Sequence, residues 1–145
     1  MKRRILVVDD DVAVVLTLRA VLELSGFEVE TANSVSQAVE KMESGVYQMV
    51  ITDLRMETED SGLEVMRAAR RQSYDPATAL LTAYPPDHQN WRQETTESIL
   101  IKPMGTKELI RQLEALLIRH EDEKQLRHRD RIPGGGVDDL NRKAG

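Results

Sequence analysis

The chain has 145 residues, 40% of them hydrophobic and 31% charged, which fits one compact domain and leaves no room for two. Its formal net charge of -5 disfavours the basic surface that nucleic-acid binding requires, and the absence of cysteine excludes disulfides and thiolate metal sites. No apolar run approaches the ~20 residues of a membrane span or the apolar core of a secretory signal, so we expect a cytoplasmic protein without membrane contact.

Short β-branched runs alternate along the chain with longer segments of helical period, which is typical of a parallel sheet with crossover helices. Residues 5–8 form a continuous apolar run that ends in acids, as expected for a strand buried on both faces. A helix is predicted over residues 12–24, and Gly26 is expected to end it. The apolar positions of this helix are Val15, Leu18, Ala20 and Leu22. Residues 27–31 alternate like a strand at or near a sheet edge.

A second helix and a third strand are predicted next. Ser34 and Gln37 have the spacing of a capping box, in which each side chain bonds to the backbone of the other residue. The helix that follows has an apolar stripe of Ala38, Val39 and Met42. Residues 49–52 are predicted to form a strand that stops at Asp53.

The following segments predict one more helix and two more strands. Residues 62–71 have the period of a helix, and its apolar side consists of Leu63, Val65, Met66 and Ala69. Residues 77–82 are typical of a fourth strand and residues 99–101 of a fifth. Between them, residues 87–98 are nearly all polar around Trp91, which predicts either one exposed helix or no stable helix.

The last predicted helix begins with Thr106 as its cap. Its apolar side consists of Leu109, Ile110, Leu113, Leu116 and Leu117, and we expect the core to end near Ile118. We therefore predict a folded domain over residues 1–120. Residues 121–145 are expected to be a polar helix extension toward Leu126 or beyond, a linker or a disordered tail.

Together these elements predict an α/β fold with a doubly wound, five-stranded parallel sheet flanked by about five helices. In such a sheet the functional crevice lies at the carboxyl ends of the strands. The residues expected there are Asp9, Asp10, Asp53, Thr82 and Lys102. Converging carboxylates repel one another, and a hard cation such as Mg²⁺ resolves the repulsion. An ammonium and a hydroxyl suit phosphoryl oxygens, and a carboxylate can accept a phosphoryl group.

Four segments carry a family resemblance, each of them at the end of a predicted strand. They are residues 5–11 (ILVVDDD), 51–56 (ITDLRM), 81–83 (LTA) and 101–103 (IKP). In this order and context they form a strong signal. Over roughly residues 3–118 the chain resembles the receiver domain of the response regulators of two-component signalling, which has the CheY-like, flavodoxin-like fold.

The resemblance implies that Asp53 is the phosphoacceptor for a sensor histidine kinase or a phosphotransfer protein. The implied Mg²⁺ ligands are Asp9, Asp10, Asp53 and the backbone carbonyl of Arg55. Lys102 would pair with the phosphoryl group, and Thr82 would supply the hydroxyl that moves toward it. The chain would then be a signalling domain and not an enzyme, with self-phosphorylation and slow autodephosphorylation as its only chemistry.

The resemblance also assigns positions that flank the site. Ala83 leaves room beside the phosphoryl group, and Pro103 follows the conserved lysine position. Arg55 and Tyr84 would shield the acyl phosphate from water. Ile99 stands where the family commonly has an aromatic ring that moves with the switch hydroxyl.

The loop after Asp53 departs from the family pattern. Glu57 stands in place of the usual proline, and Gly62 lies nine residues after Asp53 in place of eight. The loop is therefore expected to be one residue longer and acidic, with Glu59 and Asp60 as its other acids.

Other readings of these residues stay open. Asp9–Asp11 are also typical of a helix cap, and His88, His120 and His128 are expected to be exposed to solvent. The longer loop and Ile99 are compatible with a degenerate receiver that binds proteins without phosphate. A haloacid-dehalogenase-like phosphatase is disfavoured, because that family needs an acid where Arg55 stands. A homodimer, a downstream output protein or a missing output domain are the further partners considered.

Overall fold

The computed structural model describes residues 2–53, 56–58, 60–82, 98–101 and 105–131. Within them the five strands form one parallel sheet in the order β2-β1-β3-β4-β5. The strands are β1 (Arg4–Val8), β2 (Glu28–Ala32), β3 (Met49–Thr52), β4 (Ala77–Thr82) and β5 (Ser98–Ile101). The predicted doubly wound parallel sheet is confirmed, and β2 lies at its edge as expected.

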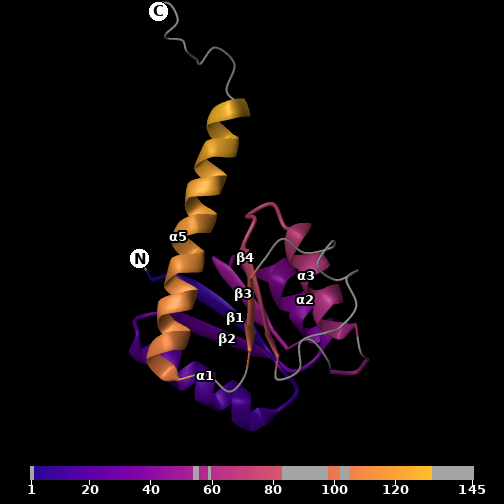
Figure 1. The fold of residues 1–145 in the computed structure, drawn as a ribbon. Coiled ribbons are helices and arrows are strands. Elements are labelled where there is room, and N and C mark those ends of the chain that lie inside the picture. Colours follow the sequence, from indigo (N-terminus) through magenta and orange to yellow (C-terminus); the bar gives the residue numbers. More distant parts are fainter. Residues whose placement is uncertain (1, 54–55, 59, 83–97, 102–104, 132–145) are drawn as a thin grey trace, which may run out of the picture.

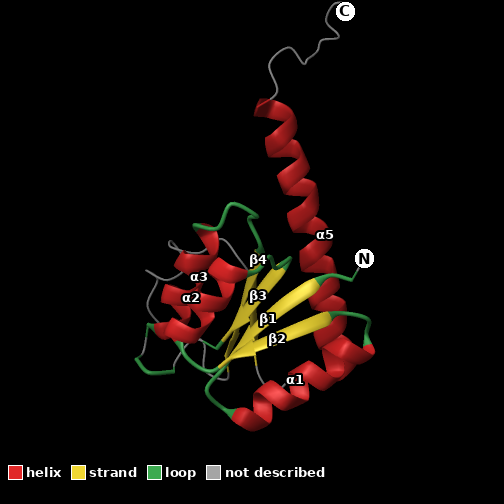
Figure 2. Ribbon diagram, turned by 180° about the vertical axis from the view of Figure 1, so that it is seen from behind, coloured by secondary structure: helices red, strands yellow, loops and turns green. Residues whose placement is uncertain are grey.

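Helices cover both faces of the sheet (Figures 1 and 2). The helices of the described residues are α1 (Val12–Leu24), α2 (Val35–Ser44), α3 (Ser61–Arg70) and α5 (Thr106–Arg131). One face packs against α1 and α5, and the other packs against α2 and α3. Of the predicted polar segment at residues 87–98, residues 87–97 lie outside the described residues, and Ser98 is the first residue of β5.

The core has two layers because alternate side chains of each central strand point to opposite faces of the sheet. Ile5 and Val7 of β1 join the cluster under α1 and α5, whereas Leu6 and Val8 join the cluster under α2 and α3. All four are at most 1% exposed, which explains the continuous apolar run in the sequence.

Both ends of α1 are capped by local sequence. The Asp11 carboxylate accepts hydrogen bonds from the backbone N–H groups of Ala13 and Val14, at 3.0 and 3.4 Å. At the other end Gly26 takes φ +97° and Phe27 N–H donates to the Leu22 carbonyl at 3.1 Å, which is a Schellman ending. Leu18 and Leu22 are buried as predicted, but Ala20 is exposed, because it lies on the solvent side of the helix.

The predicted capping box of α2 is formed in part. Ser34 Oγ accepts from the Gln37 N–H at 3.2 Å, as expected. The Gln37 side chain, however, accepts from the N–H of Asn33 at 2.8 Å and not from that of Ser34. The first N–H group of the helix, that of Val35, instead donates to Glu57 of the loop after β3. Ala38 and Met42 are fully buried, as the stripe predicted.

Helix α5 continues well past the sheet (Figure 1), so the polar extension predicted after Ile118 is helical through Arg131. His120 is 7% exposed, so its predicted solvent exposure was wrong. Its ring Nε2 lies 2.9 Å from the carbonyl oxygen of Asp75, in the turn between α3 and β4. The division of the chain at residue 120 stays a prediction.

Two further side chains of α5 hold the same turn. Lys124 Nζ donates to the Tyr74 carbonyl at 3.1 Å, and Arg127 pairs with the Asp75 carboxylate at 2.6 Å. We call Tyr74, Asp75, His120, Lys124 and Arg127 the α5 clamp. Asp75 has φ 50°, a left-handed conformation that Asp tolerates better than most residues. The clamp therefore fixes the direction of the helix beyond the core.

Tyr74 also ties this turn to α2. Its hydroxyl donates to the Met42 carbonyl at 2.9 Å, and its ring lies 6.5 Å from that of Tyr47. Burial, followed by the neighbouring Tyr47, raises the pKa of Tyr74 to about 12. The hydroxyl therefore keeps its proton, and its role as donor, at any pH near neutrality.

No helix within the described residues is long and apolar enough to span a membrane.

We expect Thr78→Val to stabilise the protein by about 1 kcal/mol, because it removes a buried hydroxyl without a partner. Thr78 is 1% exposed, and among the described residues its Oγ1 has no hydrogen-bond partner. Urea unfolding of both proteins measures the difference. A destabilised variant would contradict the prediction.

We expect Arg127→Ala to loosen the end of α5 with little effect on the domain, because an exposed ion pair contributes less than about 1 kcal/mol. Hydrogen exchange of residues 121–131 should become faster, while the urea midpoint should stay nearly unchanged. Glu123→Ala, on the exposed side of the same turn, is the control. Equal exchange rates in the two variants would argue against the clamp.

Candidate functional site

Three acids converge at the carboxyl edge of the sheet. Asp9 follows β1, and Asp53 follows the neighbouring β3. One carboxylate oxygen of each of Asp9, Asp10 and Asp53 lies within 4.8 Å of those of the other two. From β1 the chain crosses to β2 on one side, and from β2 it crosses back past β1 to β3 on the other side. The strand order therefore reverses between β1 and β3, and the cluster lies at this point, where ligands bind in doubly wound folds.

Continued strand pairing holds Asp9 and Asp53 in place. The Asp9 N–H donates to the Ala32 carbonyl at 3.1 Å, and the Asp53 N–H donates to the Val8 carbonyl at 2.9 Å. The Thr52 hydroxyl, fully buried, donates to the Asp53 carbonyl at 2.9 Å. The sheet therefore sets the spacing of the acids.

The consecutive acids after β1 have separate roles. Asp11 caps α1, so the alternative reading as a helix cap holds for this residue. Asp9 is 3% exposed, and its Oδ1 accepts from the Asp11 N–H at 3.0 Å. Asp10 is exposed and Asp53 half-buried, so the cluster opens to solvent on one side.

The donor set fits a hard divalent cation. With Mg–O distances near 2.1 Å, neighbouring ligands of an octahedral Mg²⁺ lie about 3.0 Å apart and opposite ligands about 4.2 Å apart. The acidic oxygens lie within 4.8 Å of one another, so they would move closer together to bind one ion. Oxygen ligands of this kind suit Mg²⁺ better than they suit soft metals.

Of the remaining predicted site residues, the structure describes the backbone of only two, Thr82 and Ile99. Thr82 ends β4 and pairs in register with Ile101, the last residue of β5. Ile99 lies within β5, opposite Leu80. The side chains of Thr82 and Ile99 are not described. The other predicted site residues outside the described part of the chain are Arg55, Ala83, Tyr84, Lys102 and Pro103.

Sequence reasoning missed the contact that Glu57 makes. The acidic loop after Asp53 was expected, but not that one of its carboxylates reaches the first turn of α2. An acid in the family's proline position was the signal, but only the fold brings residues 35 and 57 together.

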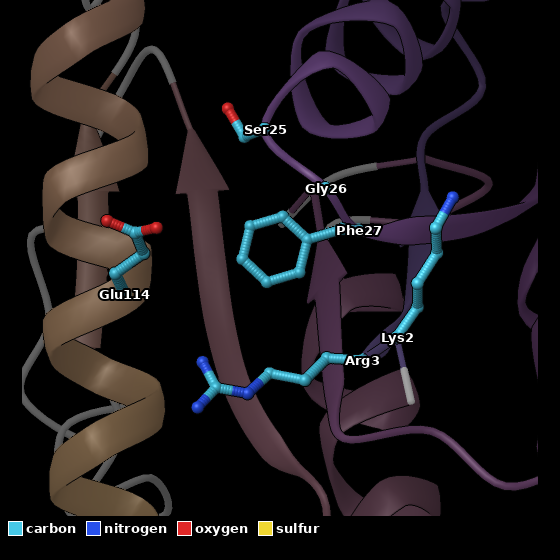
Figure 3. A pocket seen from close by; sticks show the side chains of 6 residues that line it. All are labelled: Lys2, Arg3, Ser25, Gly26, Phe27 and Glu114. Atoms are coloured by element: carbon cyan, nitrogen blue, oxygen red, sulfur yellow. The ribbon is translucent and has the colours of Figure 1, made fainter.

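A hollow of about 490 Å³ lies at the other end of the strands, where their amino ends meet. It lies where β1 and β2 begin, and is lined by Lys2, Arg3, Ser25, Gly26, Phe27 and Glu114. Figure 3 shows Arg3 extending toward α5, which carries Glu114, beside the Phe27 ring. Its lining is separated from the three acids by the full length of β1, so it is no part of their site.

Comparison with known proteins gives the family. The profile of the response regulator receiver domain matches residues 5–114. The transcriptional regulatory protein CpxR homolog of Haemophilus influenzae is 34% identical over 118 residues, which cover 80% of this chain and 51% of that protein. The alginate biosynthesis regulatory protein AlgB of Pseudomonas aeruginosa is 34% identical over 131 residues, 83% of this chain and 29% of that protein. The chain thus spans about half the length, or less, of these curated relatives.

Solved structures share the fold. A CheY-like receiver domain from Methanospirillum hungatei superposes with a TM-score of 0.76 at 22% identity, covering 85% of this chain and 99% of that one. The response regulator TrrA of Thermotoga maritima, solved in complex with Mg²⁺–BeF, has a TM-score of 0.68 at 34% identity and covers 79% and 98%. With the fold, the acid cluster and the sequence match in agreement, the chain belongs to the response regulator receiver domain family of two-component signal transduction.

Proposed function

We propose that this receiver domain takes a phosphoryl group on Asp53 and thereby switches a protein-interaction surface. The observation that carries the proposal is the placement of Asp9, Asp10 and Asp53 within 4.8 Å at the carboxyl edge. Asp53 is half-buried and follows a central strand, so the sheet holds its backbone while its side chain stays partly open to a donor.

The reaction is a phosphoryl transfer between a nitrogen and an oxygen. A carboxylate oxygen of Asp53 forms a bond to phosphorus while the bond from phosphorus to the histidine nitrogen of the donor breaks. The electron pair of that bond stays on the imidazole nitrogen, and the product is an acyl phosphate. The β1–β3 pairing contributes by holding the Asp53 backbone at a fixed place, which lowers the cost of orientation.

Mg²⁺ is the proposed cofactor, held by Asp9, Asp10, Asp53 and the backbone carbonyl of Arg55. When bound, it supplies positive charge that offsets the repulsion among the carboxylates and phosphoryl oxygens. The related TrrA structure in complex with Mg²⁺–BeF supports this part of the proposal.

Lys102 and Thr82 are proposed to contact the phosphoryl group from the other side, by charge and by hydroxyl hydrogen bond. The end of β4 supports this, because Thr82 is in register with Ile101, the residue before Lys102. Ala83, Tyr84, Ile99 and Pro103 are proposed to flank the group. The negative charge gained at Asp53 then shifts the equilibrium between two conformations of the domain, which differ in the protein-interaction surface.

A sensor histidine kinase or phosphotransfer protein is the proposed donor. Val12 and Leu16, on the first two turns of α1 beside the acid cluster, are 68% and 59% exposed. This apolar pair offers a contact for a donor that reaches Asp53. The curated relatives are longer than this chain. We therefore propose that the signal passes to an output domain or to a separate output protein, and that a homodimer is one arrangement in which the receiver domain acts.

A phosphate-independent binding module is the second candidate, favoured by the longer loop after Asp53. The acid cluster weighs against it, because three converging carboxylates cost stability unless they serve a ligand.

We expect Asp53→Asn to abolish labelling by acetyl phosphate and Mg²⁺, because an amide does not accept the phosphoryl group. Intact-protein mass spectrometry should find a single phosphoryl adduct on the wild type and on the control Asp60→Asn, which alters another acid of the same loop. An adduct on Asp53→Asn at the wild-type level would refute the assignment, and folded wild type without an adduct would favour the second candidate.

We expect Asp10→Asn to raise the melting temperature without Mg²⁺ and to reduce the rise that Mg²⁺ produces, since it removes one of the repelling charges and one ligand. The control is Asp11→Asn, because Asn caps a helix about as well as Asp. Differential scanning calorimetry with EDTA or with Mg²⁺ measures both effects. The same Mg²⁺-induced rise in wild type and Asp10→Asn would contradict the proposed metal site.

A further inference from the structure

Glu57 joins the loop after the phosphoacceptor strand to a helix that is distant in sequence. Both carboxylate oxygens of Glu57 lie 3.3 Å from the backbone nitrogen of Val35, the first residue of α2. This N–H is one of the first four of the helix, which have no partner within the helix itself. The contact links positions 22 residues apart, so it depends on the folded sheet.

Two caps share the start of α2. Ser34 Oγ accepts from the Gln37 N–H, and Glu57 accepts from the Val35 N–H. A carboxylate is the favoured partner there, because the partial positive charge of a helix N-terminus attracts an anion. The Glu57 carboxylate therefore lies at the N-terminus of α2.

The neighbours of Glu57 restrain the same loop. Met56 is half-buried and packs against the core cluster under α2 and α3. On the other side, Thr58 N–H donates to Ser61 Oγ at 2.9 Å, at the start of α3. The loop is therefore held to the core by Met56, to α3 by Thr58 and to α2 by Glu57.

We propose that Glu57 is a positioning residue for the phosphoacceptor loop, which keeps the chain beyond Asp53 in the place that Mg²⁺ binding requires. The inference rests on the proposed function, because Asp53 and the carbonyl of Arg55 are proposed ligands and Glu57 follows them by four and two residues. Its carboxylate acts through the backbone and touches neither the metal nor the phosphoryl group. The replacement of the family's proline by an acid is thereby explained: a contact across the fold restrains this loop.

The test separates position from charge by comparing four variants. Glu57→Gln keeps the length of the side chain and one accepting oxygen but loses the charge. Glu57→Asp keeps the charge, but its side chain is one methylene shorter, which draws the carboxylate away from the Val35 N–H. Glu57→Ala loses both, and Asp60→Asn removes a charge from the same loop at a helix cap position that makes no side-chain cap bond.

Two measurements are made on each protein: the Kd for Mg²⁺ by isothermal titration calorimetry, and hydrogen exchange of the Val35 amide by NMR without metal. We expect Glu57→Ala and Glu57→Asp to bind Mg²⁺ about tenfold more weakly, as for other residues that orient metal ligands. Their Val35 amide should exchange faster. Asp60→Asn should stay close to the wild type in both measurements. Glu57→Gln should lie closer to the wild type than Glu57→Ala does, because it keeps one accepting oxygen and loses only the attraction of the helix N-terminus for an anion.

Three results would overturn the inference. If Glu57→Asp binds Mg²⁺ as the wild type does while Glu57→Gln does not, charge alone matters. If Glu57→Ala matches Asp60→Asn while the wild type binds Mg²⁺ and is phosphorylated, only the positioning role fails. If the wild type neither binds Mg²⁺ nor gains a phosphoryl group, the proposed function and this inference fail together.

Discussion

The pairing of β1 with β3 at the centre of the sheet is the constraint on which the site depends. Val8 is in register with Thr52, and the ladder runs one step further when the Asp53 N–H donates to the Val8 carbonyl. Because parallel strands end at the same edge, this single register brings Asp9 and Asp10 to Asp53. A slip of one residue would turn the core side chains of a strand to the wrong layer, so packing on both faces protects the geometry of the acids.

Helix α2 runs from the carboxyl ends of the strands to their amino ends. Its first residue, Val35, contacts Glu57 near the acid cluster, whereas the carbonyl of Met42, near its other end, accepts from Tyr74 in the turn that holds α5. The helix is short and packed against the core through Ala38 and Met42, which are fully buried. Helix α2 therefore contacts the loop after Asp53 at its start and Tyr74 of the α5 clamp near its other end.

The sequence predicted what depends on local pattern. Strands β1 and β3, the Gly26 ending of α1 and the buried stripe of α5 follow from apolar period and turn chemistry, and strand ends in acids pointed to the cluster. Ala20 was misplaced, because it lies two residues from both Leu18 and Leu22 and therefore about 200° around the helix from each of them. His120 was misplaced because its environment comes from Asp75, 45 residues away. The sequence does contain a signal for the contacts of α5. Its buried face continues at helical spacing into polar residues, in the series Leu113, Leu117, His120, Lys124 and Arg127.

The clamp gives α5 a consequence for geometry. A helix advances 1.5 Å and turns about 100° with each residue, so a clamped helix fixes both the distance and the rotational phase of whatever continues from it. The clamp contacts of α5 are at residues 120, 124 and 127, and the described part of the helix runs to Arg131. One residue inserted between Arg127 and Arg131 would rotate a following segment about a quarter turn around the helix axis. Insertions of increasing length would therefore place that segment at a series of different angles around the axis.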